Sequence, residues 1–180
     1  MPADMKGIIA GTFLNLLQHE SIDKITVKAL IDECHISRQT FYYHFQDIMD
    51  VLEWSVRQTT QQLVEQSLKT EDMRSALRIF ISFSVKHYPL LHKLMSSQRR
   101  PQVEQIMIEA IGAYLKELAQ SRQEDISGSY LDREILLRYN ACGLVGVLLE
   151  YGGKPNLNQE RLAEQLEKVL SGELSAWNGK

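Results

Sequence analysis

The sequence is poor in cysteine and contains no long hydrophobic run. Its two cysteines, Cys34 and Cys142, lie far apart in apolar helical contexts, so we expect buried, reduced thiols in preference to a disulfide. No apolar stretch reaches the roughly 18 residues that indicate a transmembrane helix, and the N-terminus lacks a basic segment followed by an apolar leader. We therefore expect a cytoplasmic protein without a membrane partner.

The sequence also lacks a surplus of positive charge. Its formal net charge is −3 at pH 7, and the first fifty residues are no more basic than the rest. This balance argues against a protein that binds nucleic acid by general electrostatic attraction. Any nucleic-acid recognition must therefore come from a local set of side chains.

A cluster of catalytic or metal-binding residues is missing as well. The suggestive groups are three pairs, none of which has a third ligand or a nucleophile at a diagnostic spacing: His19 with Glu20, Cys34 with His35, and His87 with His92. We therefore expect no enzymatic activity, no metal site and no cofactor.

Apolar residues are plentiful, at 44% hydrophobic content, and they recur at helical spacing along most of the chain. This pattern predicts an all-α protein with a sizeable core. We expect a three-helix headpiece in residues 1–46 and about six further helices in residues 47–180. A long helix that Asp47 caps would connect the two domains, and the polar segment 120–129 would form the longest loop.

The segment from Thr26 to Phe45 predicts two short helices joined by a tight turn. The first helix has an apolar stripe and ends near His35, and Ser37 is a suitable N-cap for the second. Phe41 and Phe45, one turn apart, are the two clear core anchors of the second helix. Most of that helix is therefore expected to face outward.

The outward residues of the second helix combine guanidinium, amide, hydroxyl, phenol and imidazole groups. A DNA major groove suits this mixture, because its walls present phosphate oxygens and its floor presents base edges. Arg38 can contact guanine or a phosphate, and Gln39 can read adenine. The methyl group of Thr40 can meet the methyl group of a thymine.

Other candidate contacts lie beside these three. Tyr43 can meet a base with its ring edge, whereas Tyr42 and His44 suit phosphates. Thr26 caps the first helix and Lys28 lies in its first turn, so the two can hold another phosphate. The candidate DNA-binding residues are Thr26, Lys28, Ser37, Arg38, Gln39, Thr40, Tyr42, Tyr43 and His44.

By pattern alone a packing interpretation is equally supported, because Tyr and His on a helix are often half-buried packing residues. A family resemblance favours DNA binding. The segment resembles the helix-turn-helix of the tetracycline-repressor (TetR) family of bacterial transcription regulators, whose signature is Ser-x-x-Thr-(Leu/Phe)-Tyr-x-His-Phe with an upstream Thr-Val pair. The matching residues are Thr26, Val27, Ser37, Thr40, Phe41, Tyr42, His44 and Phe45. The resemblance implies a regulator, most often a repressor, that binds double-stranded DNA.

Three departures from the family pattern have physical consequences. His35 stands where the family usually has Gly, so we expect it to adopt a left-handed backbone conformation. Ile31 and Cys34 replace smaller residues, which implies looser packing between the two helices. Ile48 replaces a Lys that often meets a phosphate, so we expect fewer charge contacts and a shallower salt dependence.

The resemblance also implies a homodimer that binds a palindromic operator and an effector site in the C-terminal domain. The candidate dimer interface comprises Leu137, Ala141, Leu144, Val145, Leu148, Leu162, Leu166 and Val169, although an ordinary core helix explains these residues equally well. The candidate effector pocket comprises Phe80, Phe83, His87, Tyr88, Met107, Tyr114, Tyr139 and Asn140, which simple core packing also explains.

Two alternatives stay open at this stage. The C-terminal half is short for the family, and some compact relatives, including regulators of dihydroxyacetone kinase genes, respond to a protein partner instead of a small molecule. A helical adaptor that has lost DNA binding is the other alternative, and Ile48 and the acidic balance favour it.

Overall fold

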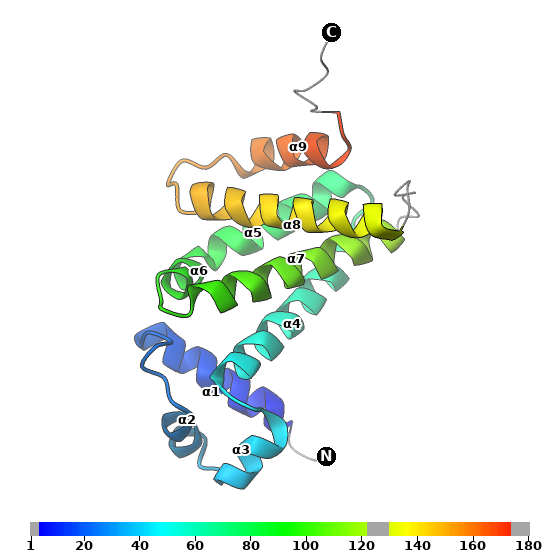
Figure 1. The fold of residues 1–180 in the computed structure, drawn as a ribbon. Helices are drawn as coiled ribbons and strands as arrows, with labels where there is room; N and C mark the ends of the chain where they lie inside the picture. The colour runs from blue at the N-terminus through cyan, green and yellow to red at the C-terminus, as the bar shows by residue number, and fades with distance from the viewer. Residues whose placement is uncertain (1–3, 122–129, 174–180) are drawn as a thin grey trace. The chain divides into compact units, whose positions relative to one another are not determined.

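The computed structural model describes residues 4–121 and 130–173. Every regular element in these residues is an α-helix, so the predicted all-α fold is confirmed. None of the helices in this part of the chain is long and apolar enough to cross a membrane. The helices are α1 (Met5–His19), α2 (Val27–Cys34), α3 (Arg38–His44), α4 (Ile48–Ser67), α5 (Met73–Lys86), α6 (Tyr88–Met95), α7 (Arg100–Ser121), α8 (Tyr130–Tyr151) and α9 (Gln159–Leu170) (Figure 1).

Side-chain caps set the starts of the helices in the helix-turn-helix segment. The Thr26 hydroxyl accepts a hydrogen bond from the backbone N–H of Ala29 at 3.1 Å, and the Ser37 hydroxyl accepts one from the backbone N–H of Thr40 at 3.0 Å. Each cap satisfies an amide that has no partner inside its helix, and a cap of this kind stabilises a helix by about 1 kcal/mol. Both caps were predicted from the sequence and are confirmed.

The predicted loop at 120–129 begins later than expected, because α7 continues through Ser121. The rest of that segment, residues 122–129, lies outside the described residues. α7 begins at Arg100, and Pro101 occupies its first turn, where a missing N–H costs no hydrogen bond.

Contacts within the chain divide it into two compact units. The head unit comprises Met1–Thr59 and Leu90–Met107, and the body unit comprises Thr60–Pro89 and Ile108–Lys180. The divisions fall within α4, α6 and α7, so each of these helices contributes to both units. The domain boundary predicted after residue 46 concerns the DNA-binding segment and stays a prediction.

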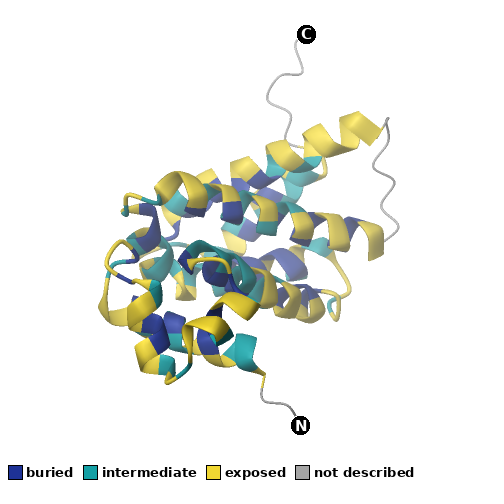
Figure 2. Cartoon of the chain, turned by 60° about the horizontal axis from the view of Figure 1, so that its bottom comes forward, coloured by how far each residue is buried: buried dark blue, intermediate teal, exposed yellow. Residues whose placement is uncertain are grey.

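The head unit is built on a shared core of its first three helices. α1 contacts both α2 and α3, and α2 contacts α3. Each helix is buried along one side and exposed along the other, as the colours of Figure 2 show. Full burial of one large apolar side chain contributes about 1.5–3 kcal/mol. The largest fully buried side chains of the head unit are those of Ile9, Phe13, Leu17, Ile22, Leu30, Phe41, Phe45 and Val51.

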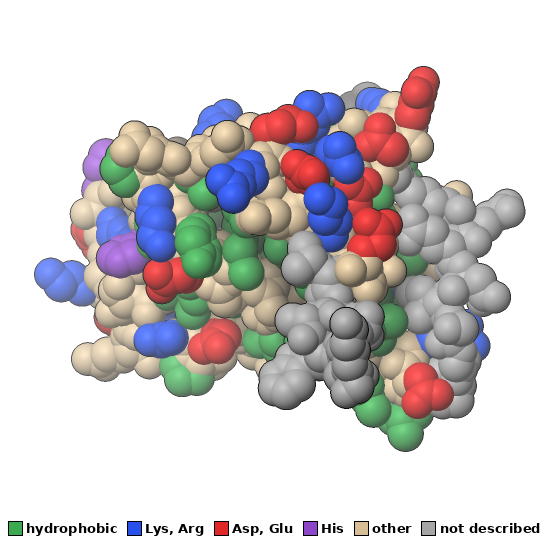
Figure 3. All heavy atoms as spheres, turned by 90° about the horizontal axis from the view of Figure 1, so that it is seen from above, with side chains coloured by type: hydrophobic (Ala, Val, Ile, Leu, Met, Phe, Trp, Pro, Cys, Tyr) green, Lys and Arg blue, Asp and Glu red, His purple; other side chains and the backbone are tan. Residues whose placement is uncertain are grey.

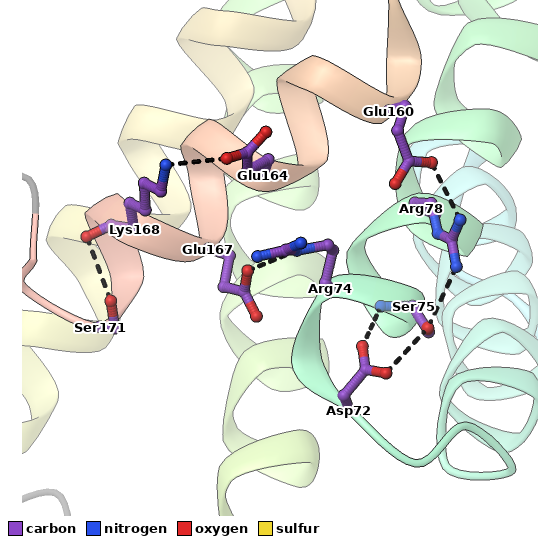
Figure 4. Close-up of polar contacts among 9 residues, drawn as sticks. All are labelled: Asp72, Arg74, Ser75, Arg78, Glu160, Glu164, Glu167, Lys168 and Ser171. Carbon is purple, nitrogen blue, oxygen red and sulfur yellow. Dashed lines mark hydrogen bonds and ion pairs between the residues drawn. The ribbon is translucent and has the colours of Figure 1, made fainter.

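The body unit packs α5 against α8 and, most extensively, against α9. Two ion pairs connect the outer sides of α5 and α9 (Figure 4). Arg74 Nε lies 2.7 Å from Glu167 Oε2, and Arg78 Nη1 lies 2.9 Å from Glu160 Oε2. The hydrogen bond that Arg74 donates to Glu167, followed by the negative charge of Glu167, raises the pKa of Arg74. Because these pairs are exposed and screened by solvent, they contribute little to stability, and burial of apolar side chains does most to hold α9 in place.

A buried tyrosine joins three helices of the body unit. The Tyr114 hydroxyl on α7 donates to the carbonyl oxygen of Ala76 on α5 at 3.1 Å and shares a hydrogen bond of 2.9 Å with the Ser67 hydroxyl on α4. Its ring stacks on Phe80 with centroids 5.2 Å apart. Tyr114 is therefore a core residue whose polar group is satisfied inside the protein.

Two glycines follow directly after α8, which ends at Tyr151. The ring of Tyr88 lies against Gly152 and Gly153, and its hydroxyl donates to the carbonyl oxygen of Leu149 at 3.2 Å. A Cβ atom at Gly152 would lie only 2.7 Å from Cδ2 of Tyr88 and 2.6 Å from the carbonyl oxygen of Leu148. The close approach of this ring therefore requires glycine at the end of α8.

Candidate nucleic-acid interface

The turn between α2 and α3 depends on a histidine in a left-handed conformation. His35 has φ 53° and ψ 42°, and it is the one non-glycine residue with positive φ in the described part of the chain. The backbone N–H of Ile36 donates to the carbonyl oxygen of Ile31 at 3.2 Å, which closes the end of α2. The predicted conformation of His35 is therefore confirmed.

Two phenylalanines hold α3 on the head unit. Phe41 and Phe45 are buried, with ring centroids 6.2 Å apart, as their spacing predicted. The Phe45 ring also meets Trp54 of α4 edge-on at 6.0 Å, and Lys6 Nζ of α1 lies 5.3 Å from its centroid. Because both anchors lie on one side of a short helix, the other side of α3 faces outward.

The outward side of α3 presents aromatic and polar groups together. Tyr42 is 57% exposed and Tyr43 is 83% exposed. Arg38 and Gln39 precede them in the first turn and are also exposed. In residues 4–121 and 130–173, no salt bridge involves Arg38, so its guanidinium is available for an anionic group.

Three of the predicted contact residues are less accessible or already engaged. Thr40 and His44 are half-buried, and the His44 ring meets Tyr43 edge-on at 4.9 Å. The hydroxyl groups of Ser37 and Thr40 lie 2.8 Å apart and share a hydrogen bond. These groups stiffen the first turn of α3, and their direct contact with DNA stays a prediction.

The start of α2 provides a second exposed polar group on the head unit. Thr26 and Lys28 are both exposed, and Thr26 caps the third amide of the helix. The amides of Val27 and Lys28 point toward the same helix end, where a phosphate would be favourable. A phosphate contact at Thr26 and Lys28 therefore stays a prediction.

The start of α4 is closed to phosphate by its own carboxylates. Asp47 Oδ1 accepts hydrogen bonds from the backbone N–H groups of Met49 at 2.7 Å and Asp50 at 3.0 Å. Asp50 Oδ2 accepts one from the backbone N–H of Gln46 at 2.9 Å. Ile48, which replaces the family's Lys, is buried in the core. This helix start therefore offers negative charge instead of free donors.

Sequence reasoning missed two residues, Lys93 and Asp23, which connect the end of α1 and the loop after it to α6 and the loop between α6 and α7. Lys93 Nζ donates to the carbonyl oxygens of Leu17 at 2.8 Å and Gln18 at 3.2 Å, near the end of α1. Asp23 Oδ2 accepts a hydrogen bond from the backbone N–H of Gln98 at 3.1 Å. Both contacts lie within the head unit and join residues far apart in sequence, so helical periodicity gives no signal for them.

The predicted effector-pocket residues differ in burial and in the unit to which they belong, and their role stays a prediction. Phe80 and Tyr114 are buried core residues, whereas His87 and Tyr139 are exposed. Met107 belongs to the head unit and the other seven residues to the body unit. A groove of about 550 Å³ lies between α7 and α8, and none of the eight predicted residues lines it. The reason is that aromatic and methionine stripes on these helices fill the core.

The predicted dimer interface stays a prediction, although most of its residues are buried within the single chain. Five of its eight residues are buried within a single chain, where they pack into the body unit: Ala141, Leu144, Val145, Leu148 and Leu166. Leu137 and Leu162 are half-buried, and Val169 is exposed. The core interpretation, which the sequence supported equally, accounts for these five residues.

The opposite side of α8 carries the exposed apolar residues. Leu131, Ile135 and Tyr139 recur at one-turn spacing with exposed fractions of 61%, 60% and 72%. Cys142 and Gly146 continue this outward face, and both are exposed. Figure 3, which looks down from the α9 side of Figure 1, shows hydrophobic side chains between charged groups of both signs.

Both cysteines are free thiols, as predicted, but Cys142 is exposed and Cys34 half-buried, so their predicted burial was wrong.

Comparisons with known proteins agree with this geometry. Residues 12–53 match the family described as bacterial regulatory proteins, tetR family. The chain is 22% identical over 169 residues to the HTH-type dhaKLM operon transcriptional activator DhaS of Lactococcus lactis subsp. lactis (strain IL1403), covering 91% of this chain and 87% of that protein.

Solved structures show the same fold. The dihydroxyacetone kinase operon activator DhaS superposes with a TM-score of 0.62 at 22% identity, covering 93% of this chain and 94% of that one. Lin0861 from Listeria innocua superposes with a TM-score of 0.68 at 18% identity, covering 96% and 95%. The match over residues 12–53 coincides with the helix-turn-helix and its anchors. Residues 12–53 therefore match the tetR family of bacterial regulatory proteins, and the chain shares its fold with the solved structure of DhaS.

Proposed function

We propose that this protein binds a palindromic operator as a homodimer, with α3 of each copy in a DNA major groove. The observation that carries the proposal is the row of exposed side chains on α3, Arg38, Gln39, Tyr42 and Tyr43, above two buried phenylalanines. Arg38 and Gln39 would meet base edges or phosphates in the first turn, where helix-turn-helix proteins make most base contacts. Tyr43 would meet a base with its ring edge, and Tyr42 would donate to a phosphate.

The balance between base and phosphate contacts is expected to be unusual. Lys28 and Arg38 are the exposed cations nearest the reading helix in sequence, whereas Asp47 and Asp50 occupy the start of α4. Each phosphate that a cation neutralises releases counterions and steepens the salt dependence of binding. With few such cations, operator binding should depend on salt less steeply than in relatives with a Lys at the position of Ile48.

The second copy would pack on the outward face of α8, defined by Leu131, Ile135, Tyr139, Cys142 and Gly146. Three large exposed apolar side chains on successive turns are more than a monomer surface usually leaves uncovered. The small residues Cys142 and Gly146 allow close backbone approach at the other half of the helix. Dimerisation would place two copies of α3 about 34–36 Å apart, one turn of the double helix, so that both halves of a palindrome are read.

Regulation would act through the body unit. An effector that prefers one conformation of the body would shift the protein toward that conformation and change its grip on the operator. α4, α6 and α7 run from one unit into the other, so they are the covalent routes for such a change. Release of the operator on effector binding would make the protein a repressor that acts in the bacterial cytoplasm.

A second candidate function is activation of an operon, with a protein partner in place of a small-molecule effector. The relative from Lactococcus lactis, which matches most of this chain, carries the name of a transcriptional activator. Both candidates require the same operator binding by α3. They differ in what the body unit contacts, which is a small molecule in the first candidate and a protein partner in the second.

Fluorescence anisotropy with labelled DNA from the region flanking the protein's own gene tests the operator-binding proposal. We expect salt-sensitive binding to a palindrome and a loss of about 30-fold or more in affinity for the Arg38→Ala, Tyr42→Ala double variant, because each contact contributes about 1–3 kcal/mol. Arg57→Ala is the matched control, since Arg57 is an exposed arginine of the head unit that pairs with Glu53 at 2.6 Å.

Three outcomes would contradict the proposal. An equal loss in the Arg57→Ala protein would mean that bulk charge matters more than α3. Unchanged affinity in the double variant would remove α3 as the reading element. An absence of salt-sensitive binding to any flanking DNA would favour a helical adaptor.

A further inference from the structure

We propose that the groove between α7 and α8 binds an anionic amphipathic small molecule, that is, an acid group joined to an apolar body. The groove lies entirely within the body unit, and its volume of about 550 Å³ falls within the range typical of small-molecule sites. It differs in location from the pocket that the sequence predicted. Its role as an effector site rests on the proposed function, whereas the binding itself does not.

Small residues create the space between the two helices. α7 presents Gly112, Ala113 and Ala119 to the groove, and α8 presents Ala141. A Cβ atom at Gly112 would lie 3.9 Å from Cβ of Ala141, which is an ordinary contact, so the helices are close at this level. With no long side chain from these positions, the floor stays open and largely apolar.

The apolar floor indicates the body of the ligand. Ile108 and Leu137 line the groove together with the small residues and are half-buried, so each leaves apolar surface in contact with water. Covering that surface with a hydrocarbon chain or ring would be favourable by roughly 25 cal/mol per Å². A small hydrated anion such as sulfate could not provide this contribution.

The charged rim indicates the acid group. Five charged residues line the groove: Glu109, Lys116, Arg133, Glu134 and Arg138. Three of them already have partners, because Glu134 Oε1 accepts a hydrogen bond from the Tyr130 hydroxyl at 3.3 Å, and Glu109 and Arg138 each make an interaction.

The two remaining groups are both cations, one from each helix. Within residues 4–121 and 130–173, neither Lys116 nor Arg133 forms a hydrogen bond or salt bridge with its side chain. A guanidinium binds a carboxylate, sulfonate or phosphate through two parallel hydrogen bonds, and an ammonium adds a compact charge. A ligand acid between Lys116 and Arg133 would therefore join α7 to α8.

Titration of the full-length protein with 8-anilinonaphthalene-1-sulfonate, an aromatic acid whose fluorescence rises in apolar sites, tests the proposal. We expect one site per chain. Octanoate should displace the dye, whereas octan-1-ol, which lacks the acid, and sodium sulfate, which lacks the apolar body, should not. Displacement by sulfate at matched ionic strength would reduce the site to a pair of surface cations, and displacement by octan-1-ol would remove the need for an acid.

Matched variants locate the site. Lys116→Gln and Arg133→Gln should each weaken dye binding about tenfold, because a charge-assisted hydrogen bond contributes roughly that factor. Lys86→Gln and Arg161→Gln remove exposed cations outside the groove and should leave binding unchanged. Ala113→Phe keeps every charge but fills the groove, and it should abolish binding in a protein whose circular dichroism melt is unchanged.

Two further results distinguish this site from others. Dye bound on the outward face of α8 would respond to Ile135→Glu and not to Arg133→Gln, and that pattern would overturn the proposal. The proposal would also be overturned if the Arg133→Gln and Ala113→Phe proteins bound the dye as tightly as the unmodified protein does. Operator affinity that does not change at saturating octanoate would contradict the effector role, whereas an unliganded protein that binds no operator would contradict the proposed function and leave the groove site standing.

Discussion

The head unit and the body unit both expose aromatic and aliphatic side chains, but their surroundings differ. On α3, Tyr42 and Tyr43 follow Arg38 and Gln39, so rings and hydrogen-bond donors share one surface. On α8, the outward face runs through Leu131, Ile135 and Tyr139 without a cation or amide between them in the stripe. Rings mixed with donors fit the edges of bases and phosphates, whereas a continuous apolar stripe fits another protein helix.

The difference shows that exposure alone does not indicate the kind of partner. An exposed ring indicates a nucleic-acid contact where polar groups lie on the same helix face. It indicates a protein contact where the face is apolar throughout. The following predictions test this distinction, because each changes one region and asks whether the other keeps its property.

The largest effect is expected from Ile135→Glu on the outward face of α8. A dimer would lose two buried isoleucines, each contributing about 1.5–3 kcal/mol, and would gain two carboxylates at the interface. Dimer affinity should therefore fall by more than about 100-fold. Sedimentation velocity over a range of protein concentrations measures the change.

Lys86→Glu is the matched control, because it introduces the same carboxylate at an exposed position of α5 in the same unit. It should leave the dimer intact. A dimer that persists in the Ile135→Glu protein would mean that this face is not the interface. The apolar stripe on α8 would then not indicate a protein partner.

The next effect concerns how the other end of α8 is fixed. Gly153→Ala would place a methyl group against the ring of Tyr88, which must then move away from its hydrogen bond with Leu149. Overpacking of this kind typically costs about 1–3 kcal/mol. Urea denaturation at equilibrium should show the loss, while operator binding by the folded protein stays unchanged.

Gly112→Ala serves as the control, since its Cβ would make only an ordinary contact with Ala141. An alanine inside a helix should stabilise the protein by about 0.5–1 kcal/mol relative to glycine. Equal effects of the two substitutions would show that backbone freedom, and not the Tyr88 ring, determines the need for Gly153.

The sequence predicted the head unit in more detail than the body unit, for physical reasons. The caps at Thr26 and Ser37, the left-handed His35 and the anchors Phe41 and Phe45 all depend on residues within one or two helical turns. Such local interactions leave a signal in spacing and residue type. These predictions were confirmed because the interactions behind them act over one or two helical turns.

In the body unit, the sequence did not predict which side of α8 is buried. Helical spacing identifies the two sides of α8, but the buried set around Leu144 and the exposed set around Ile135 are both apolar. Which of them faces α5 and α9 is decided by packing between distant segments, so spacing alone did not show that the set around Leu144 is buried within the chain. The contact of Lys93 with Leu17 has the same origin, because no local pattern connects α6 with the end of α1.

A smaller effect separates a buried from an exposed tyrosine. Tyr114→Phe removes a hydroxyl that bonds both Ala76 and Ser67, leaving two buried polar groups with one partner fewer. We expect a loss of about 1–2 kcal/mol in unfolding free energy. Tyr139→Phe removes a hydroxyl from an exposed ring and should change stability by less than about 0.5 kcal/mol. Thermal unfolding of both variants measures the two losses, and equal losses would mean that the bonds of the Tyr114 hydroxyl to Ala76 and Ser67 do not stabilise the fold.

The smallest effect is a pH dependence in the body unit that the head unit should not share. Partial burial, followed by the charge of neighbouring Lys86, lowers the pKa of His87 below its ordinary value of 6.5. The ring lies against Phe83 with centroids 4.4 Å apart, a surrounding that favours the neutral form. The unfolded chain therefore binds a proton at higher pH than the folded protein does, so stability should fall as the pH decreases below about 6.5.

Melting temperatures at pH 7.5 and pH 5.5 should differ less for His87→Gln than for the unmodified protein. His19→Gln, which changes an exposed histidine of the head unit, should keep the full difference, and a His87→Gln protein with the same pH dependence as the unmodified chain would remove His87 as its source.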